Sequence, residues 1–273
     1  MGTRTKYKMT DEIIKVNGKT LHRVEALTDI PYAKVNAGDK GGFIESEENL
    51  SQEGNCWVGD DGQVSEDAQV YDNAWVSGNA WVFGNAQVFG DAQVYDNARV
   101  FDNAEVYGRA KVSGLAWVTD NAIVFGDVQV FDNAQVFGDA QVYDRAIVSW
   151  YACVCDNAIV SGSARVSGSA KVSGLAWVTD NAIVFDNAIV SGNAQVFGNA
   201  QVFGDAQVLE GAQVSGDAQV SGNAWVYGNA QVYDSAKVSD NAWVFGDAQV
   251  SGNAQVSGNV QVSGTTKLSG ESA

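Results

Sequence analysis

The sequence predicts an all-β protein in which a single chain winds into a solenoid of short parallel strands, preceded by a small β cap. Every sixth position from Ala68 to Thr266 is alanine, except Val128, Val260 and Thr266 itself. The second residue after each of these positions is valine, up to Val262, and no insertion or deletion breaks the register. A long unbroken period is typical of repeat proteins, in which each unit packs against its neighbours.

Each hexad has the form Ala-x-Val-x-(Gly/Asp)-(Asn/Asp), as in residues 86–91. Alanine and valine are two residues apart, so on a strand their side chains point to the same side and form an apolar stripe that must be buried. The two x residues point the other way. Glycine, aspartate and asparagine at the fifth and sixth positions tolerate the backbone of a sharp corner. A helix is excluded, because a period of six does not follow the helical period of about 3.6.

This unit resembles the hexapeptide repeat of left-handed parallel β-helix proteins, in which an aliphatic residue is followed four positions later by a small one. The resemblance covers residues 56–271, which hold 36 hexads. In that family three hexads form one triangular coil, so the resemblance implies a left-handed, triangular, single-stranded parallel β-helix of about 12 coils. The handedness rests on the resemblance alone.

Residues 1–55 differ from the repeat and are expected to form an N-terminal cap, followed by the solenoid of residues 56–273. Within residues 13–24, two apolar-rich stretches flank Asn17-Gly18, which predicts a β-hairpin with a tight turn. A cap covers the open sheet edge at the end of a solenoid, which otherwise invites aggregation.

The first coil is expected to begin inside this cap. Ile44 and Leu50 are six residues apart, and two extra residues precede Val58. The segment resembles the cap of a group of bacterial and prophage hexapeptide-repeat proteins of undefined function, which implies a phage or prophage origin.

The chain is strongly acidic, with a formal net charge of −17 and a pI of about 4.2. Nucleic acids and anionic membranes bind basic surfaces, so we expect neither as a direct partner. No apolar run approaches the ~20 residues of a membrane span, and the first eleven residues contain no apolar signal region. The three cysteines are too few for a disulfide framework. We expect the protein in the cytoplasm, or in the host cytoplasm if it is phage-encoded.

Catalysis is not expected. Many hexapeptide-repeat proteins are acyltransferases, and these resemble one another in a histidine general base on a coil and in loops that interrupt the coils. Here the repeats contain no histidine, and His22 lies in the predicted hairpin, where we expect a surface residue. Acyl transfer needs such a base, so we predict no enzyme, no catalytic residue and no cofactor.

The repeats also give little sign of a metal site. Their aspartates recur at corners, where they act as turn formers. Cys153 and Cys155 flank an inward-facing valine, so we expect two outward, unpaired thiols. Two thiols without further ligands are a weak site for a soft metal, and we predict none.

The outward positions are where a binding function would lie. With three hexads in a coil, residues 18 apart stack in columns. One column holds Tyr71, Phe89, Tyr107, Phe125 and Tyr143, another holds Phe83, Phe101 and Phe137, and Trp81, Trp117, Trp225 and Trp243 share a face. Such ladders stabilise stacked strands, and they can also form an apolar surface for a partner or for self-association.

One corner breaks the pattern. Trp150 and Tyr151 replace the usual glycine or aspartate and asparagine, just before Cys153 and Cys155. Bulky residues strain a corner, so this segment is a candidate interaction site.

Three functions are compatible with the sequence. The first is a non-catalytic structural or interaction protein that presents aromatic and glutamine-rich faces to a protein partner or to itself. The second is an acidic decoy that imitates nucleic acid and binds a host nucleic-acid-handling protein. The third is an inactive relative of the hexapeptide acyltransferases. A decoy releases its partner steeply as salt rises, and binding of acyl-CoA identifies the third.

Overall fold

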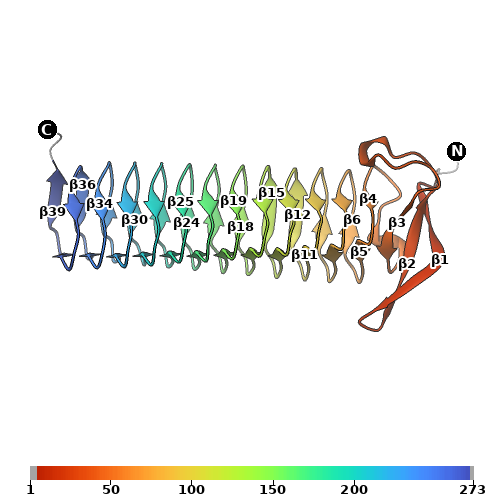
Figure 1. Cartoon of the computed structure of the whole chain (residues 1–273), viewed down its shortest axis with the longest axis horizontal. Coiled ribbons are helices and arrows are strands. Elements are labelled where there is room, and N and C mark those ends of the chain that lie inside the picture. The colour runs from red at the N-terminus through yellow and green to blue at the C-terminus, as the bar shows by residue number, and fades with distance from the viewer. Residues whose placement is uncertain (1–4, 271–273) are drawn as a thin grey trace. The chain divides into compact units, whose positions relative to one another are not determined.

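The structure is a computed structural model that describes residues 5–270. The chain divides into two compact units, one up to Asn133 and one from Ala134. Each unit is a parallel β-solenoid with three sheets, and the first unit also carries an antiparallel cap (Figure 1). The predicted fold class is therefore confirmed.

The first unit contains three stacks of parallel strands. The first stack is β3 (Lys40–Ile44), β5 (Gln63–Val64), β8 (Trp81–Val82), β11 (Arg99–Val100) and β14 (Trp117–Val118). The second is β4 (Trp57–Val58), β7 (Trp75–Val76), β10 (Gln93–Val94), β13 (Lys111–Val112) and β16 (Gln129–Val130). The third is β6 (Gln69–Val70), β9 (Gln87–Val88), β12 (Glu105–Gly108) and β15 (Ile123–Gly126).

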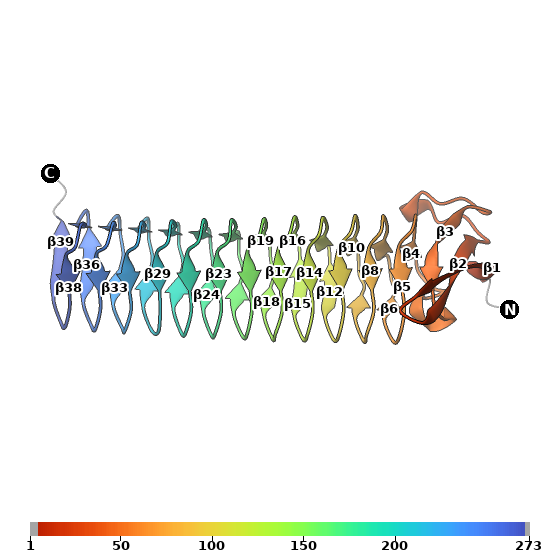
Figure 2. The same ribbon diagram turned by 60° about the horizontal axis from the view of Figure 1, so that its bottom comes forward.

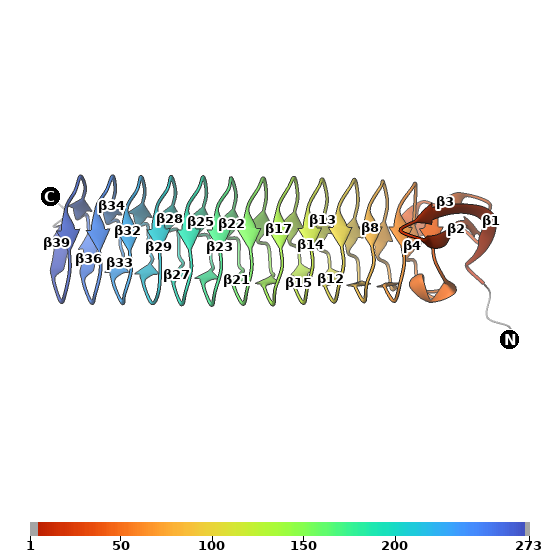
Figure 3. The same ribbon diagram turned by 90° about the horizontal axis from the view of Figure 1, so that it is seen from below.

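The second unit repeats this arrangement, and turned views bring strands of its other rows forward (Figures 2 and 3). Its first stack is β17 (Gln135–Val136), β20 (Cys153–Val154), β23 (Lys171–Val172), β26 (Ile189–Val190), β29 (Gln207–Val208), β32 (Trp225–Val226), β35 (Trp243–Val244) and β38 (Gln261–Val262). Its second is β19 (Ile147–Val148), β22 (Arg165–Val166), β25 (Ile183–Val184), β28 (Gln201–Val202), β31 (Gln219–Val220), β34 (Lys237–Val238) and β37 (Gln255–Val256). Its third is β18 (Gln141–Val142), β21 (Ile159–Val160), β24 (Trp177–Val178), β27 (Gln195–Val196), β30 (Gln213–Val214), β33 (Gln231–Val232), β36 (Gln249–Gly252) and β39 (Lys267–Gly270).

The backbone ladder pairs residues that are 18 apart in sequence, which is one coil, and each strand amide bonds to the carbonyl 17 residues later. The amide of Gln87 donates to the carbonyl of Ala104 at 2.9 Å, and the amide of Phe89 donates to the carbonyl of Val106 at 3.0 Å. The alanine and valine side chains of the hexads are almost all fully buried inside the coils. The predicted inward stripe is therefore the core.

A second set of bonds links the corners of successive coils. The fifth residue of a hexad has a positive φ, for example +60° at Asp180, a conformation that glycine and aspartate tolerate better than most residues. Asp180 Oδ2 accepts the amide of Gly198 in the next coil at 3.0 Å, and Asp144 does the same for Gly162 at 3.1 Å. We call this contact the carboxylate clamp. It satisfies a corner amide for which the ladder has no acceptor.

Replacing a clamp aspartate tests this contact. We expect Asp180→Ala to lower the free energy of unfolding by about 1–2 kcal/mol, because alanine disfavours a positive φ and leaves the Gly198 amide without its carboxylate. Asp180→Asn keeps both the side-chain oxygen and the tolerance of a left-handed backbone, so it is the matched control. Urea unfolding of the three proteins measures the difference. Equal losses for alanine and asparagine would contradict the clamp.

The cap is a three-stranded antiparallel sheet that continues into the solenoid. β1 (Tyr7–Val16) pairs with β2 (Lys19–Ala26), and Asn17 and Gly18 form the turn with φ values of +50° and +82°. β2 then pairs antiparallel with β3, whose other edge pairs parallel with β5. The predicted hairpin is confirmed, and its strands extend beyond residues 13–24.

The first coil begins inside the cap, as predicted. Ile44 pairs with Val64 and Leu50 bridges to Val70, so both offsets are 20 residues. From Val58 onward the offset is 18. The two extra residues therefore lie between Leu50 and Val58.

Only short helices occur among residues 5–270. These are the 3-10 turns η1 (Pro31–Ala33) and η2 (Glu47–Asn49). Neither is long enough to cross a membrane.

Two buried polar side chains of the cap attach it to the first coil. Tyr7 is fully buried, and its hydroxyl donates to the carbonyl of Leu50 at 2.6 Å. The Lys6 ammonium is 5% exposed and donates to the Cys56 carbonyl at 2.9 Å, the Cys56 Sγ at 3.0 Å and the Glu53 carbonyl at 3.2 Å. Three acceptors for three N–H groups offset the cost of burying this charge. Burial raises the pKa of the Tyr7 hydroxyl and also that of the Cys56 thiol.

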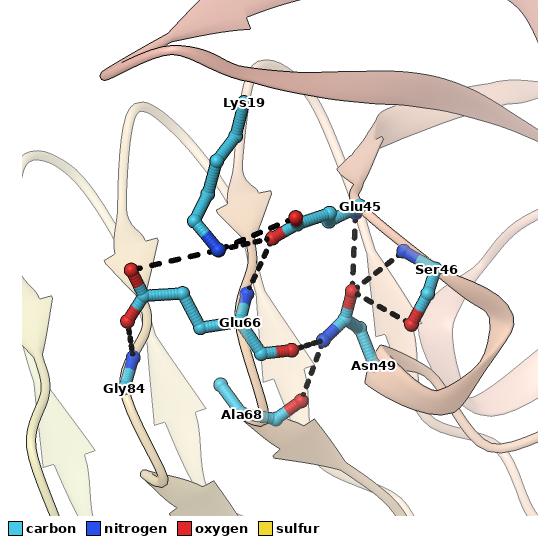
Figure 4. Close-up of polar contacts among 7 residues, drawn as sticks. All are labelled: Lys19, Glu45, Ser46, Asn49, Glu66, Ala68 and Gly84. Carbon is cyan, nitrogen blue, oxygen red and sulfur yellow. Dashed lines mark hydrogen bonds and ion pairs between the residues drawn. The ribbon is translucent and has the colours of Figure 1, made fainter.

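A polar cluster connects the hairpin to the first corners (Figure 4). Lys19 on β2 forms an ion pair with Glu45 at 3.0 Å and lies 3.7 Å from Glu66. Glu45 Oε2 also accepts the Glu66 amide at 2.7 Å. Asn49 donates to the carbonyls of Glu66 and Ala68 at 2.8 and 2.9 Å. These side-chain contacts hold the cap to the first coil, in addition to the backbone hydrogen bonds of the β-ladder.

This cluster makes the attachment of the cap sensitive to acid. The Glu66 amide and Lys19 hold the pKa of Glu45 below its usual value. Because the folded pKa is depressed, the contribution of Glu45 is present above its ordinary pKa, about 4.5, and is lost as pH falls through the lower folded value.

We expect the protection factors of the β3 amides, which compare each exchange rate with the intrinsic rate at the same pH, to fall in acid more in the wild-type chain than in Glu45→Gln. The glutamine keeps an acceptor for the Glu66 amide and removes the charge, so the two proteins should converge between about pH 6 and about pH 3. A difference that stays constant with pH would contradict a role for the ionised carboxylate.

Candidate functional site

The outer face of β8, β11 and β14 carries a cluster of aromatic rings around one arginine. The guanidinium of Arg99 lies 5.6 Å from the ring centre of Trp81 and 5.4 Å from that of Trp117. Trp117 is 39% exposed. Sequence reasoning identified both tryptophans but missed Arg99, although it lies 18 residues from each of them. Such cation–π contacts hold the rings in place.

Phenylalanines extend this cluster. Phe83 and Phe101 stack with ring centres 4.8 Å apart, and Phe101 meets the edge of Trp117 at 6.1 Å. The Trp81 Nε1 is buried and has no hydrogen-bond partner among residues 5–270. The cluster is a packed surface in which Arg99 and Trp117 are exposed and the other rings are half-buried.

The predicted tyrosine and phenylalanine column stacks in the first unit. Ring centres are 4.8 Å apart for Tyr71 and Phe89, 4.6 Å for Phe89 and Tyr107, and 5.0 Å for Tyr107 and Phe125. These side chains are half-buried. Tyr143 begins the corresponding positions of the second unit. The predicted stacking of this column is confirmed within the first unit, and its use as a binding surface remains a prediction.

The second unit has its own ladders. Trp225 stacks on Trp243 at 5.6 Å, as predicted for this face. Phe185 and Phe203 also stack, at 4.9 Å. Aromatic stacking thus stabilises both units.

The irregular corner of the second unit is strained and exposed. Trp150 has a φ of +62°, although bulky residues rarely adopt a positive φ. Trp150 is 60% exposed and Tyr151 is 63% exposed, more than any other large apolar side chain among residues 5–270. This corner ends two residues before Cys153 in the sequence.

The two thiols differ in exposure, and the prediction of two outward surface thiols is wrong for Cys155. Cys155 is only 2% exposed, whereas Cys153 is half-buried. Cys155 occupies the fourth hexad position, next to the corner, where short side chains are covered. Ser149 and Ser173 at the same position are 4% and 7% exposed.

The thiols also differ in their acidity. The Cys155 thiol donates a hydrogen bond to the Cys153 sulfur, which lowers the pKa of Cys153 and raises the pKa of Cys155. Lys171 lies opposite Cys153 on the neighbouring strand and lowers the pKa of Cys153 further. The thiolate is the reactive form, so we expect Cys153 to be the more reactive cysteine of the pair.

Alkylation by iodoacetamide tests this assignment. We expect Cys153 to react several-fold faster than Cys155 or Cys56 near neutral pH, as followed by peptide mass spectrometry. Cys155→Ala removes the donor and should slow Cys153, whereas Cys155→Ser keeps a hydroxyl donor and should preserve most of its rate. Equal rates in the two variants would show that the hydrogen bond does not activate Cys153.

The single histidine of the sequence makes a contact within the cap. His22 lies on β2, and its Nδ1 is 3.0 Å from the carbonyl oxygen of Thr10. Within residues 5–270, no three His, Cys, Asp or Glu side chains are grouped so that they could hold a metal ion.

Known repeats resemble parts of both units. Six segments match the YdcK β-solenoid repeat, namely residues 68–84, 92–108, 152–168, 212–228, 218–234 and 248–264. Each begins at the alanine of a hexad and spans almost one coil, so the similarity concerns the repeat. The chain is accordingly a β-solenoid repeat protein similar to this type. Comparison with curated proteins finds no match.

Proposed function

We propose that this chain is a non-catalytic interaction scaffold, and that the corner at Trp150 and Tyr151 is where a protein partner binds. The observation that carries the proposal is the combination of backbone strain and exposure at this corner. A strained residue persists when something other than stability favours it. Exposed tryptophan and tyrosine are the side chains most enriched at the energetic centres of protein interfaces.

Other features support a binding role over a catalytic one. The interior consists of alanine and valine, so the residues that differ between coils lie on the outside. The partner is a protein or a second copy of the chain. The hexapeptide-type handedness, the phage or prophage origin and the cytoplasmic location complete the proposal, and they rest on the sequence resemblance and on the composition.

The acidic decoy has weaker support. Corner carboxylates alternate with glycines in many columns, as in Asp60, Gly78, Asp96 and Gly114. Nucleic acid presents a charge about every 1.7 Å along a duplex, a much denser array.

The residues at the regular corners of the repeat suggest a variant that tests this corner. Trp150→Gly with Tyr151→Asn restores the residues found at most other corners. We expect this variant to be as stable as the wild type or up to about 1 kcal/mol more stable, because glycine removes the positive-φ strain. We also expect partner binding or self-association to weaken at least about tenfold. Light scattering over a concentration series and affinity capture with the full chain measure binding, and urea unfolding measures stability.

Trp177→Gln is the matched control. It removes a tryptophan that is 49% exposed in the same unit, at a strand position where Gln195 of the next coil shows that glutamine fits. Binding should be unchanged in this control. A corner variant that binds normally would disprove the assignment. Steep loss of binding with salt would favour the decoy, and saturable binding of acetyl-CoA would favour the acyltransferase relative.

A further inference from the structure

Two similar hollows lie on one outer face of the first unit, over the stack β4, β7, β10, β13 and β16. The first has a volume of about 300 Å³ and surrounds Ser77, and the second has a volume of about 290 Å³ and surrounds Ser113. Every residue that lines the first hollow has a counterpart 36 residues later in the second. The hollows are therefore two coils apart, and equivalent stretches of backbone form them.

The hollows arise from alternating side-chain size at the fourth hexad position. This column reads Ser77, Tyr95, Ser113 and Phe131. Aromatic rings fill alternate coils, and the serines leave space between them. Both hollows are lined by Tyr95, and the second is also lined by Phe131.

A carboxylate clamp lies in each hollow. Asp60 Oδ2 accepts the amide of Gly78 at 3.1 Å in the first, and Asp96 Oδ2 accepts the amide of Gly114 at 3.2 Å in the second. Each bond engages one of the two carboxylate oxygens. The other oxygen is an acceptor for a ligand group.

Two lining positions distinguish the two hollows. At one of them Tyr95 of the first hollow corresponds to Phe131 of the second, and at the other the charge differs. The first has Trp75, which is 36% exposed, and the second has Lys111 at the equivalent position. The Trp75 indole fits because residue 59 is glycine: a Cβ there would lie 3.2 Å from the Trp75 Nε1. The first hollow thus combines a carboxylate with an indole and a phenol ring. In the second, the lysine brings a positive charge to the same place.

We propose that the first hollow binds an arginine side chain of a basic protein segment. The inference rests on the proposed scaffold function and names the chemistry of its partner. A guanidinium stacks on aromatic faces and pairs with carboxylates, so it uses both kinds of group in the hollow. The net charge of −17 favours a basic partner.

The first unit already holds its own arginines in this way. The Arg23 guanidinium lies 4.2 Å from the ring centre of Phe43, and Arg23 pairs with Glu12 at 2.6 Å and with Asp61 at 3.3 Å. Arg99 lies between two tryptophan rings. The first hollow offers the same groups without an arginine among its lining residues.

The test uses the full chain with nitrogen-15 label and N-acetyl-arginine amide as the probe. NMR resolves the tryptophan indole N–H signals, and Trp75→Phe identifies that of Trp75. We expect the Trp75 signal to shift saturably with the arginine probe. N-acetyl-citrulline amide has the same shape without the charge, and it should shift the signal at least about five-fold less at equal concentration.

Two variants make the assignment specific. Asp60→Asn keeps an oxygen for the Gly78 amide and removes the charge, so the arginine affinity should fall at least about five-fold. Trp75→Lys puts the lysine of the second hollow into the first and removes the indole reporter, so the Gly78 amide signal is followed in its place. This signal should no longer respond to the arginine probe.

Absence of a saturable Trp75 shift, an equal response to citrulline, or unchanged affinity in Asp60→Asn would each overturn the proposal. These outcomes leave the scaffold function standing, because that function is tested separately at Trp150 and Tyr151. Conversely, loss of the corner as a binding site would leave the arginine titration unaffected.

Discussion

The backbone ladder requires paired residues to be 18 apart in sequence, as Gln201 and Gln219 are, and most features of both units follow from this spacing. Each amide of a strand finds its acceptor one coil later, as Gln201 does with Ala218 at 2.9 Å. An inserted residue has no partner at this spacing and must leave the ladder, as the two extra residues between Leu50 and Val58 do in the first coil. From Val58 onward the spacing stays at 18, so variation is confined to the side chains of the outer positions and corners.

The same spacing stacks equivalent corners directly above one another, which is a problem for an acidic chain. Two carboxylates in successive coils would repel each other at the strand spacing of about 4.8 Å. Along many columns the chain places a glycine after each aspartate, and the carboxylate then satisfies the amide of that glycine, as Asp72 does for Gly90 at 3.2 Å. Asp102 and Asp120 are successive, and there the Thr119 hydroxyl donates to Asp102 at 2.5 Å. The aspartates that carry the charge at these corners are thus also the acceptors of the corner hydrogen bonds.

Repetition explains what could be predicted from sequence. The hexad determines the inward alanine and valine, and Asn17-Gly18 determines the hairpin turn. The offset between Leu50 and Val58 revealed the two extra residues. Features that depend on neighbouring coils were not predictable in the same way. The burial of Cys155 depends on how the corner covers short side chains, and the hollows depend on side-chain sizes 18 and 36 residues apart. The buried Lys6 lies outside the repeat, so no sequence periodicity predicts its burial. Left-handedness remains a prediction.

A solenoid with an invariant interior places its specificity in departures from the repeat. Because the backbone is nearly the same in every coil, one substitution on the outer surface changes the chemistry of a site without changing its shape. The pair of hollows illustrates this: Trp75 and Lys111 occupy equivalent positions, and the exchange of an indole for an ammonium separates a site suited to a cation from one that repels it. The corner at Trp150 also departs from the repeat, and its strained backbone costs more stability locally. A position can be compared with the equivalent positions in neighbouring coils. Where it departs from them and costs stability or exposes apolar surface, it is the best guide to where this protein binds.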